Sequence, residues 1–217
     1  IPYEALAFES GYEPAAGEPG RDRWLGYSAN RTAHAVILRH AGAPRPWLVC
    51  VHGYLMGGAG FGFWIFDAIR HYEQLGLNVA LPVLPLHGPR RAGRFSGEGF
   101  LGGNVLDTVH AEAQTVWDLR RLLRWIRAQG DAPIGVHGVS LGGYSAALLA
   151  GIDAALSCVI AGLAPSDLAR LAWHHAPAAT VRSIESSGIV RDQVAELYRV
   201  VSPLALPARC PARGRAI

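Results

Sequence analysis

The chain has 217 residues, half of them apolar, and a formal net charge of +3. This length suits one domain with a substantial core, and the apolar content excludes a disordered tail. All 20 basic residues are arginine. Four of them lie together on one side of a predicted helix, namely Arg120, Arg121, Arg124 and Arg127. Such a group is typical of a solvated face, so we expect no nucleic-acid partner.

The three cysteines, Cys50, Cys158 and Cys210, have neither paired spacing nor a metal-binding signature. We therefore expect free thiols in a reducing, cytoplasmic setting, with no metal bound by these cysteines. No apolar run approaches the ~18 residues that a membrane helix needs. The sequence begins at Ile1 without a visible signal peptide, so the prediction is a cytoplasmic protein without a membrane span.

Residues 1–23 are rich in Glu, Pro and Gly and predict an irregular lead-in. Two early strands are predicted at residues 24–27 and 32–40. A proline-bearing turn then precedes the run Trp47–Val51, which is apolar at every position. A strand of this kind is typical of the centre of a parallel sheet that helices cover on both faces.

Helical spacing of apolar residues predicts one helix from Phe63 to Leu75, ending at Gly76. A second buried strand is predicted from Asn78 to Leu84. Residues 88–104 have no periodicity and predict a long loop. A strong helix follows from the expected N-cap Asn104 to about Ala128.

The segment around Ser140 organises the middle of the chain. An apolar strand leads into Gly138-Val139-Ser140-Leu141-Gly142, and a helix begins directly afterwards. This spacing matches the nucleophile elbow, in which a serine sits on a sharp strand-to-helix turn. Only very small neighbours two positions away let the strand and the helix pass closely. The pattern therefore predicts an exposed, reactive hydroxyl on Ser140 in an unfavourable backbone conformation.

A further strand is predicted at residues 156–162, followed by two helical pieces over 166–200 that break around Pro177. Residues 214–217 read as the start of another strand. Strands that alternate with helices predict parallel βαβ units in a three-layer α/β fold with a mostly parallel central sheet. We interpret residues 1–217 as one domain, with 166–200 as a helical insertion near the pocket.

With His52-Gly53 after one buried strand and the Ser140 motif after a later one, the chain resembles the α/β-hydrolases from residue 24 onward. The resemblance implies a serine hydrolase of the esterase or lipase kind, with Ser140 as nucleophile and with no cofactor and no metal. It also implies an oxyanion hole made by the backbone N–H groups of Tyr54 and Leu141. Fixed backbone donors suit this role because they are in place before charge develops on the substrate oxygen.

Three further residues are candidates for the pocket. In the resembling family the residue at the position of His52 usually shapes the oxyanion loop rather than acting as a base. His87 follows the strand at 78–84 and is expected to line the pocket or brace the loop. Met56 could line the pocket or pack in the core.

The family places an acid and then a histidine after the nucleophile, and this sequence departs from that order. His174 and His175 fall in the helical insertion, and Asp153 and Asp167 follow the elbow helix and the next strand. Asp167 is better explained as a helix N-cap. We therefore expect the domain to be incomplete at its C-terminus, with the acid and histidine beyond Ile217. A protein ending there is expected to have negligible esterase activity.

The function predicted from the sequence is cleavage of a small carboxylic ester, or an amide, through an acyl-enzyme on Ser140. An acyltransferase with the same nucleophile differs only in the group that attacks the acyl-enzyme. A non-catalytic ligand-binding protein on the same scaffold is the alternative from another class, although a binding module does not need a strained serine.

Overall fold

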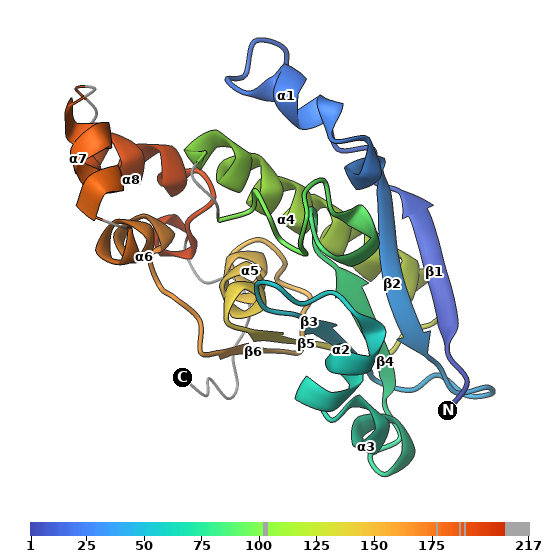
Figure 1. Cartoon of the computed structure of the whole chain (residues 1–217). Coiled ribbons are helices and arrows are strands. Elements are labelled where there is room, and N and C mark those ends of the chain that lie inside the picture. The colour runs from blue at the N-terminus through green and yellow to red at the C-terminus, as the bar shows by residue number, and fades with distance from the viewer. Residues whose placement is uncertain (102–103, 177, 187, 189, 207–217) are drawn as a thin grey trace.

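The structure is a computed structural model that describes residues 1–101, 104–176, 178–186, 188 and 190–206. Strands and helices alternate along most of the chain (Figure 1). The strands are β1 (Glu4–Glu9), β2 (Thr32–Leu38), β3 (Trp47–Val51), β4 (Asn78–Val83), β5 (Ile134–Val139) and β6 (Cys158–Gly162). The helices are α1 (Arg21–Gly26), α2 (Ala59–Ile65), α3 (Ala68–Glu73), α4 (Val105–Ala128), α5 (Leu141–Ala150), α6 (Leu168–His175), α7 (Ala178–Ser186) and α8 (Arg191–Arg199). Short 3-10 turns are η1 (Ser28–Arg31), η2 (Gly88–Arg90) and η3 (Pro203–Ala205).

The six strands form one sheet in the order β1-β2-β4-β3-β5-β6. The pairs β4–β3, β3–β5 and β5–β6 are parallel, whereas β1–β2 and β2–β4 are antiparallel. Parallel neighbours place their carboxyl ends at the same edge of the sheet, so the segments that follow β3 and β5 emerge side by side. Within the described residues, β6 is an edge strand.

Apolar side chains of β3 alternate between two cores on opposite faces of the sheet. Trp47, Val49 and Val51 pack with buried residues of α4 and α5. Leu48 and Cys50 pack instead with Phe66 and Ala68, at and beyond the end of α2. This period of two is the geometry of a strand covered on both sides, and it confirms the predicted three-layer α/β fold with a mostly parallel sheet.

The region predicted as an insertion contains three helices rather than two, namely α6, α7 and α8. The first interruption lies between His175 and Ala178, as predicted, and a second follows Ser186. A small core formed by residues of α6 and α8 packs on Tyr144 of α5. The Tyr144 hydroxyl donates a hydrogen bond of 2.9 Å to the carbonyl of Val201. The insertion therefore rests on the helix that begins just after Ser140 (Figure 1).

Three predictions about the first third of the chain were wrong. The lead-in at 1–23 contains the edge strand β1, and residues 24–27 belong mainly to the short helix α1. Trp24 in that helix is buried and donates to Gln114 at 2.9 Å. The single helix predicted over residues 63–75 is two helices, because Asp67 has a φ of 47° between α2 and α3.

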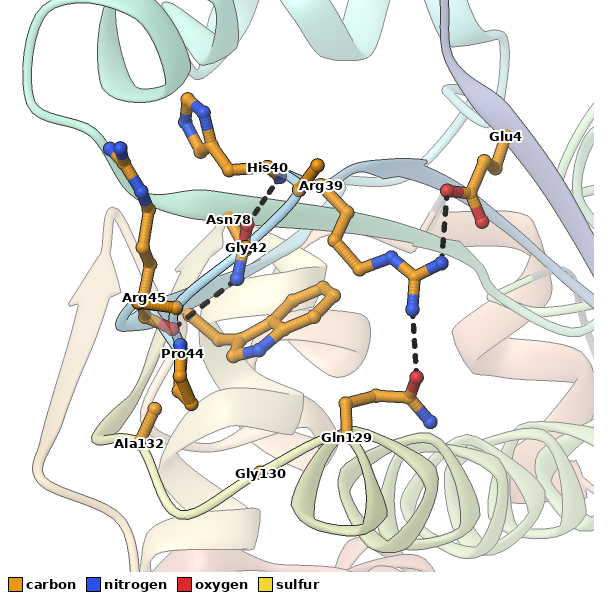
Figure 2. Close-up of a pocket in the computed structure, with 13 residues that line it drawn as sticks. Glu4, Arg39, His40, Gly42, Pro44, Arg45, Asn78, Gln129, Gly130 and Ala132 are labelled. Atoms are coloured by element: carbon orange, nitrogen blue, oxygen red, sulfur yellow. Dashed lines mark hydrogen bonds and ion pairs between the residues drawn. The ribbon is translucent and has the colours of Figure 1, made fainter.

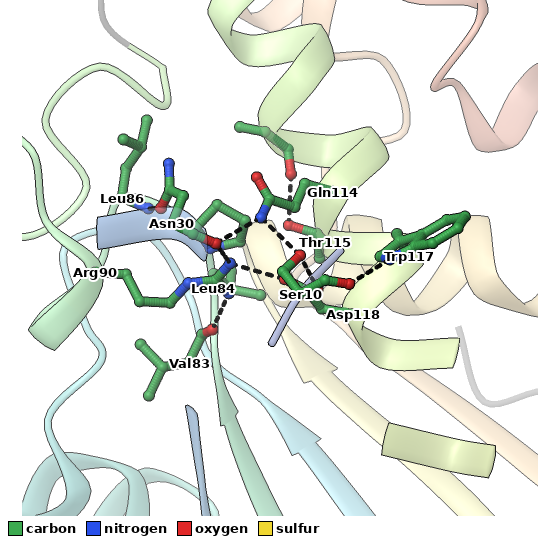
Figure 3. A network of polar contacts seen from close by, with 12 residues as sticks. Ser10, Asn30, Val83, Leu84, Leu86, Arg90, Gln114, Thr115, Trp117 and Asp118 are labelled. Atoms are coloured by element: carbon green, nitrogen blue, oxygen red, sulfur yellow. Dashed lines mark hydrogen bonds and ion pairs between the residues drawn. The ribbon is translucent and has the colours of Figure 1, made fainter. Parts of the chain in front are cut away.

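A buried polar network fastens these early segments to the rest of the domain (Figure 3). The fully buried guanidinium of Arg90 donates to Asp118 at 2.8 Å and to the Asn30 carbonyl at 3.0 Å. Ser10 donates to the other Asp118 oxygen at 2.5 Å, and Gln114 donates to both Ser10 and the Asn30 carbonyl. The end of β1, η1, η2 and α4 thus meet at one ion pair beside β4.

Candidate active site

Ser140 lies between β5 and α5, at the junction that its sequence motif predicts. Its backbone has a φ of 55° and a ψ of −116°, a combination that a non-glycine residue rarely adopts. The residue is exposed. Its N–H donates to the Gly162 carbonyl at 2.8 Å, and its carbonyl accepts from Tyr144 at 3.0 Å. The predicted strained turn is confirmed, and it is fixed by bonds on both sides.

The flanking glycines are required by the close approach of neighbouring backbone. A Cβ on Gly138 would collide with the carbonyl of Gly142, and a Cβ on Gly142 would collide with the carbonyl of Val51. A Cβ on Gly143 would lie 2.8 Å from the carbonyl of Gly162. The helix after Ser140 therefore passes within van der Waals contact of strands on both sides, which only glycine allows.

The loop after β3 lies against this turn. A Cβ built on Gly53 would be 3.4 Å from the Cβ of Ser140, so the two backbones are neighbours. Within the described residues, the N–H groups of Tyr54 and Leu141 donate no hydrogen bond, whereas the Gly53 N–H donates to the Met56 sulfur at 3.2 Å. Leu141 is the first residue of α5, where an N–H has no partner inside the helix. Their role as an oxyanion hole stays a prediction.

His52 is buried beneath this loop with a defined tautomer. Its Nε2 accepts from the Leu84 N–H at 3.1 Å, so its Nδ1–H donates to the Gly53 carbonyl at 2.8 Å. Burial, with the neighbouring His87, lowers the pKa of His52 to about 3. A neutral imidazole with both nitrogens engaged links β4 to the loop after β3, which suits a loop-shaping histidine.

His87 is fully buried, and its ring centroid lies 5.0 Å from that of His52. Its Nδ1 lies 2.8 Å from the Pro85 carbonyl, and burial lowers the pKa of His87 to about 4. Its Nε2 has no hydrogen-bond partner within the described residues. Met56 is half-buried, and its carbonyl accepts from Ser96 of the loop at 88–104. These contacts brace the loops, and a role for either residue in substrate binding stays a prediction.

A buried carboxyl behind the elbow helix was not singled out from the sequence. Glu112 of α4 is fully buried, and the Ser145 hydroxyl lies 3.0 Å from its Oε2 and 3.1 Å from the Leu141 carbonyl. Burial raises the pKa of Glu112 to about 8, although the Ser145 hydroxyl opposes the rise. The sequence held a signal, because Glu112 falls at helical spacing with the core positions Val116 and Leu119.

The acids and histidines after Ser140 are engaged elsewhere. Asp153 accepts from Arg127 at 2.9 Å, and Asp167 caps α6 by accepting from the Arg170 N–H, as its sequence position predicts. The rings of His174 and His175 contact each other edge to face. Within the described part of the chain, the Ser140 hydroxyl has no hydrogen-bond partner. None of the described acids or histidines after Ser140 is bonded to its hydroxyl.

Comparisons with known proteins support this description. Residues 85–183 match the family model for alpha/beta hydrolase domain containing 18. An acetyl xylan esterase from a Paenibacillus species has a TM-score of 0.62, at 17% identity over 94% of this chain and 80% of that one. The chain has the fold of the α/β-hydrolase family. Acetyl xylan esterase 1 from a Thermoanaerobacterium species shares this α/β-hydrolase fold, with a TM-score of 0.61 and 14% identity over 97% of this chain and 70% of that one.

A curated relative matches this chain in sequence more strongly than either esterase does. The uncharacterized protein Rv2627c of Mycobacterium tuberculosis is 45% identical over 213 residues, which cover 98% of this chain and 51% of that protein. The chain thus spans about half the length of the curated relatives it matches. Among the described residues, no helix is both long and apolar enough to cross a membrane.

Proposed function

We propose that this chain is a serine hydrolase that cleaves a carboxylic ester, or an amide, through an acyl-enzyme on Ser140. The observation that carries the proposal is the backbone of Ser140, exposed on a strand-to-helix turn with a φ of 55°. Such strain costs about 1–3 kcal/mol and is found mainly at functional sites. A ligand-binding module would have no need of it.

In this proposal the Ser140 oxygen attacks the substrate carbonyl carbon, and its proton passes to a base. The Tyr54 and Leu141 N–H groups donate to the oxyanion, and the N-terminus of α5 adds a favourable field. The base then returns the proton to the leaving alcohol oxygen as the C–O bond breaks, and water hydrolyses the acyl-serine to release the acid and restore the Ser140 hydroxyl. Loss of one oxyanion donor typically lowers the rate about 100- to 1,000-fold.

The first test is covalent labelling of the 217-residue chain by a fluorophosphonate, with the modified residue identified by peptide mass spectrometry. Since no described residue bonds the Ser140 hydroxyl, we expect added imidazole to act as an external base and accelerate labelling of Ser140. The exposed Ser28 is the internal control, and Ser140→Ala should abolish labelling at this site. Labelling of Ser140 no faster than Ser28 at every imidazole concentration would refute the proposal.

A second test removes the need for a base. In Ser140→Cys the thiol sits at the N-terminus of α5, a position that favours the thiolate. We expect nitrophenyl acetate to acylate the introduced thiol of this variant before the buried Cys50, with the mass of one acetyl group and release of nitrophenol. Tyr54→Pro removes the proposed donor N–H, whereas Tyr54→Phe keeps it. If both slow acylation equally, Tyr54 is not an oxyanion donor.

A further inference from the structure

Two leucines share the unfavourable backbone conformation of Ser140 and lie on either side of it. The strands β3, β5 and β6 are parallel neighbours, and the segments that follow them contain Leu55, Ser140 and Leu163. The φ angles of these three residues are 67°, 55° and 52°. A positive φ brings Cβ close to the neighbouring backbone, so a bulky side chain rarely adopts it. The strain at this edge of the sheet therefore extends beyond the serine.

The opposite edge of the sheet uses glycine for the same purpose. In the segments that lead into β3, β4 and β5, a positive φ belongs to Gly42, Gly76 and Gly130. Figure 2 shows Gly42 and Gly130 at this edge. Glycine adopts such a conformation without a steric penalty. A positive φ next to a strand of this sheet therefore does not in itself call for leucine.

Core packing does not account for the two leucines either. Leu86, which follows β4 with a φ of 61°, is almost fully buried in the core, so its burial offsets the strain. By contrast, Leu55 is 58% exposed and Leu163 is 88% exposed. A large apolar side chain that is both strained and exposed gives little stability to the free protein. Strained residues of this kind occur mainly where a ligand is bound.

Leu163 lies directly beside the proposed nucleophile. The residue before it, Gly162, accepts a hydrogen bond from the Ser140 N–H at 2.8 Å. The residue after it, Ala164, lies against the first turn of α5, since a Cβ built on Gly143 would be 3.0 Å from the Ala164 Cβ. The chain at Leu163 thus runs past the start of α5, next to Ser140.

Leu55 lies on the other side of Ser140, in the loop after β3. The Met56 N–H donates to the Gly53 carbonyl at 3.4 Å, which closes a four-residue turn with Leu55 in third place. A positive φ at this place is characteristic of a type II turn, where glycine or asparagine is favoured. The first residue of the turn contacts the serine, because a Cβ built on Gly53 would be 3.4 Å from the Ser140 Cβ.

We propose that Leu55 and Leu163 determine specificity by contacting an apolar acyl chain, so that esters of longer aliphatic acids are preferred to acetate esters. This inference rests on the proposed acyl-enzyme at Ser140. The acyl group stays bonded to the serine until water releases the acid, so contacts with this group act in both steps. An acyl chain that covers the two leucines removes exposed apolar surface from water, which favours binding.

The test compares methanesulfonyl fluoride with octanesulfonyl fluoride on the 217-residue chain in the presence of imidazole. The Ser140 oxygen bonds to sulfur, the S–F bond breaks with loss of fluoride, and imidazole takes the serine proton. The alkyl group then occupies the position of an acyl chain. Peptide mass spectrometry gives the octyl-to-methyl ratio of the labelling rates. We expect this ratio to be at least about tenfold higher at Ser140 than at the exposed Ser28.

Leu55→Asn and Leu163→Asn should each lower the ratio at Ser140 about three- to tenfold, because part of the apolar contact is lost. Asparagine tolerates a positive φ better than leucine does, so neither variant should melt at a lower temperature than wild type. Leu163→Met keeps an apolar side chain and should retain most of the ratio. Leu75→Asn makes the same change at a residue that is 57% exposed before β4, at the opposite edge, and should leave the ratio unchanged.

The outcomes separate this inference from the proposed function. No labelling of Ser140 by either reagent would refute the proposed function, and this inference with it. Labelling of Ser140 by both reagents with the ratio found at Ser28, or with a ratio that neither asparagine variant changes, would overturn the inference alone. Lower melting temperatures for both asparagine variants would also overturn it, because the fold itself would then require the leucines.

Discussion

Replacing Glu112 by glutamine should change how the stability of the protein depends on pH. Glu112 is fully buried in α4, and burial raises its pKa from 4.5 to about 8. The folded protein therefore keeps the carboxyl proton at pH values where the unfolded chain has lost it. The stability that depends on this proton is fully present below about pH 4.5 and is lost as the pH rises toward 8.

The magnitude follows from the size of that shift. Each pKa unit corresponds to about 1.4 kcal/mol, so the wild-type protein should lose on the order of 5 kcal/mol from this group between pH 4.5 and 8. The local geometry suits the protonated form. A protonated Glu112 can donate to Ser145, leaving the single Ser145 hydrogen for the Leu141 carbonyl at 3.1 Å.

Urea unfolding of wild type and Glu112→Gln at half-unit steps from pH 4.5 to 8 measures this effect. Glutamine does not titrate, so the variant should gain stability relative to wild type at up to about 1.4 kcal/mol per pH unit. The difference between the unfolding free energies of the two proteins at pH 4.5 measures the effect of the changed side-chain shape and hydrogen bonding alone. Glu196→Gln, which removes an exposed carboxylate, is the control for net charge. Parallel curves for wild type and Glu112→Gln would refute the reasoning.

Three more predictions concern buried groups. Burial lowers the pKa of His87 to about 4, so its contribution is present above about pH 6.5 and is lost as the pH falls toward 4. As the pH falls from 6.5 to 4, the free energy of unfolding of His87→Gln, measured in urea, should therefore decrease by up to about 3 kcal/mol less than that of the wild-type protein. An equal decrease in the two proteins would contradict this prediction. Asp118→Leu leaves the buried charge of Arg90 without a partner and should lower the free energy of unfolding by about 3–5 kcal/mol. Adding Arg90→Leu should restore part of this stability. A double mutant less stable than Asp118→Leu would contradict the prediction. Gly142→Ala should prevent folding, because the added Cβ collides with the Val51 carbonyl. Gly58→Ala, whose Cβ meets open space, should leave the melting temperature nearly unchanged. Equal melting temperatures for the two variants would contradict the steric requirement for glycine at position 142.

The central strands could be predicted from the sequence because burial on both faces leaves an uninterrupted apolar run. Trp47–Val51 was predicted with the bounds that the structure has, and β4 to within one residue. The edge strand β1 was missed because most of its positions are exposed. Only Leu6 and Phe8 of this strand pack on the core, and the antiparallel pairing with β2 that holds it is not visible in either segment alone.

Local steric demands were predictable, and contacts between distant residues were not. The turn at Ser140 could be predicted from a five-residue segment, because the glycines two positions before and after the serine make the close approach of strand and helix possible. The break at Asp67 escaped detection because apolar spacing continues across it from Phe66 to Tyr72. Arg90 and Asp118 form a buried ion pair although they lie 28 positions apart in the chain. The sequence around each residue therefore does not indicate its partner.

The strained turn at Ser140 persists because several independent contacts fix the elements around it. The Gly162 carbonyl accepts from the Ser140 N–H, which sets the turn against β6. Ser145, one turn into α5, bonds the Glu112 carboxyl, and Tyr144 bonds the Val201 carbonyl beyond α8. Rotation of α5 that relaxed the turn would have to break a buried hydrogen bond on either side, at about 1–3 kcal/mol each for the groups left unsatisfied. That cost matches or exceeds the ~1–3 kcal/mol stored in the backbone, so the serine stays exposed at the start of α5, although its hydroxyl makes no hydrogen bond to the described residues.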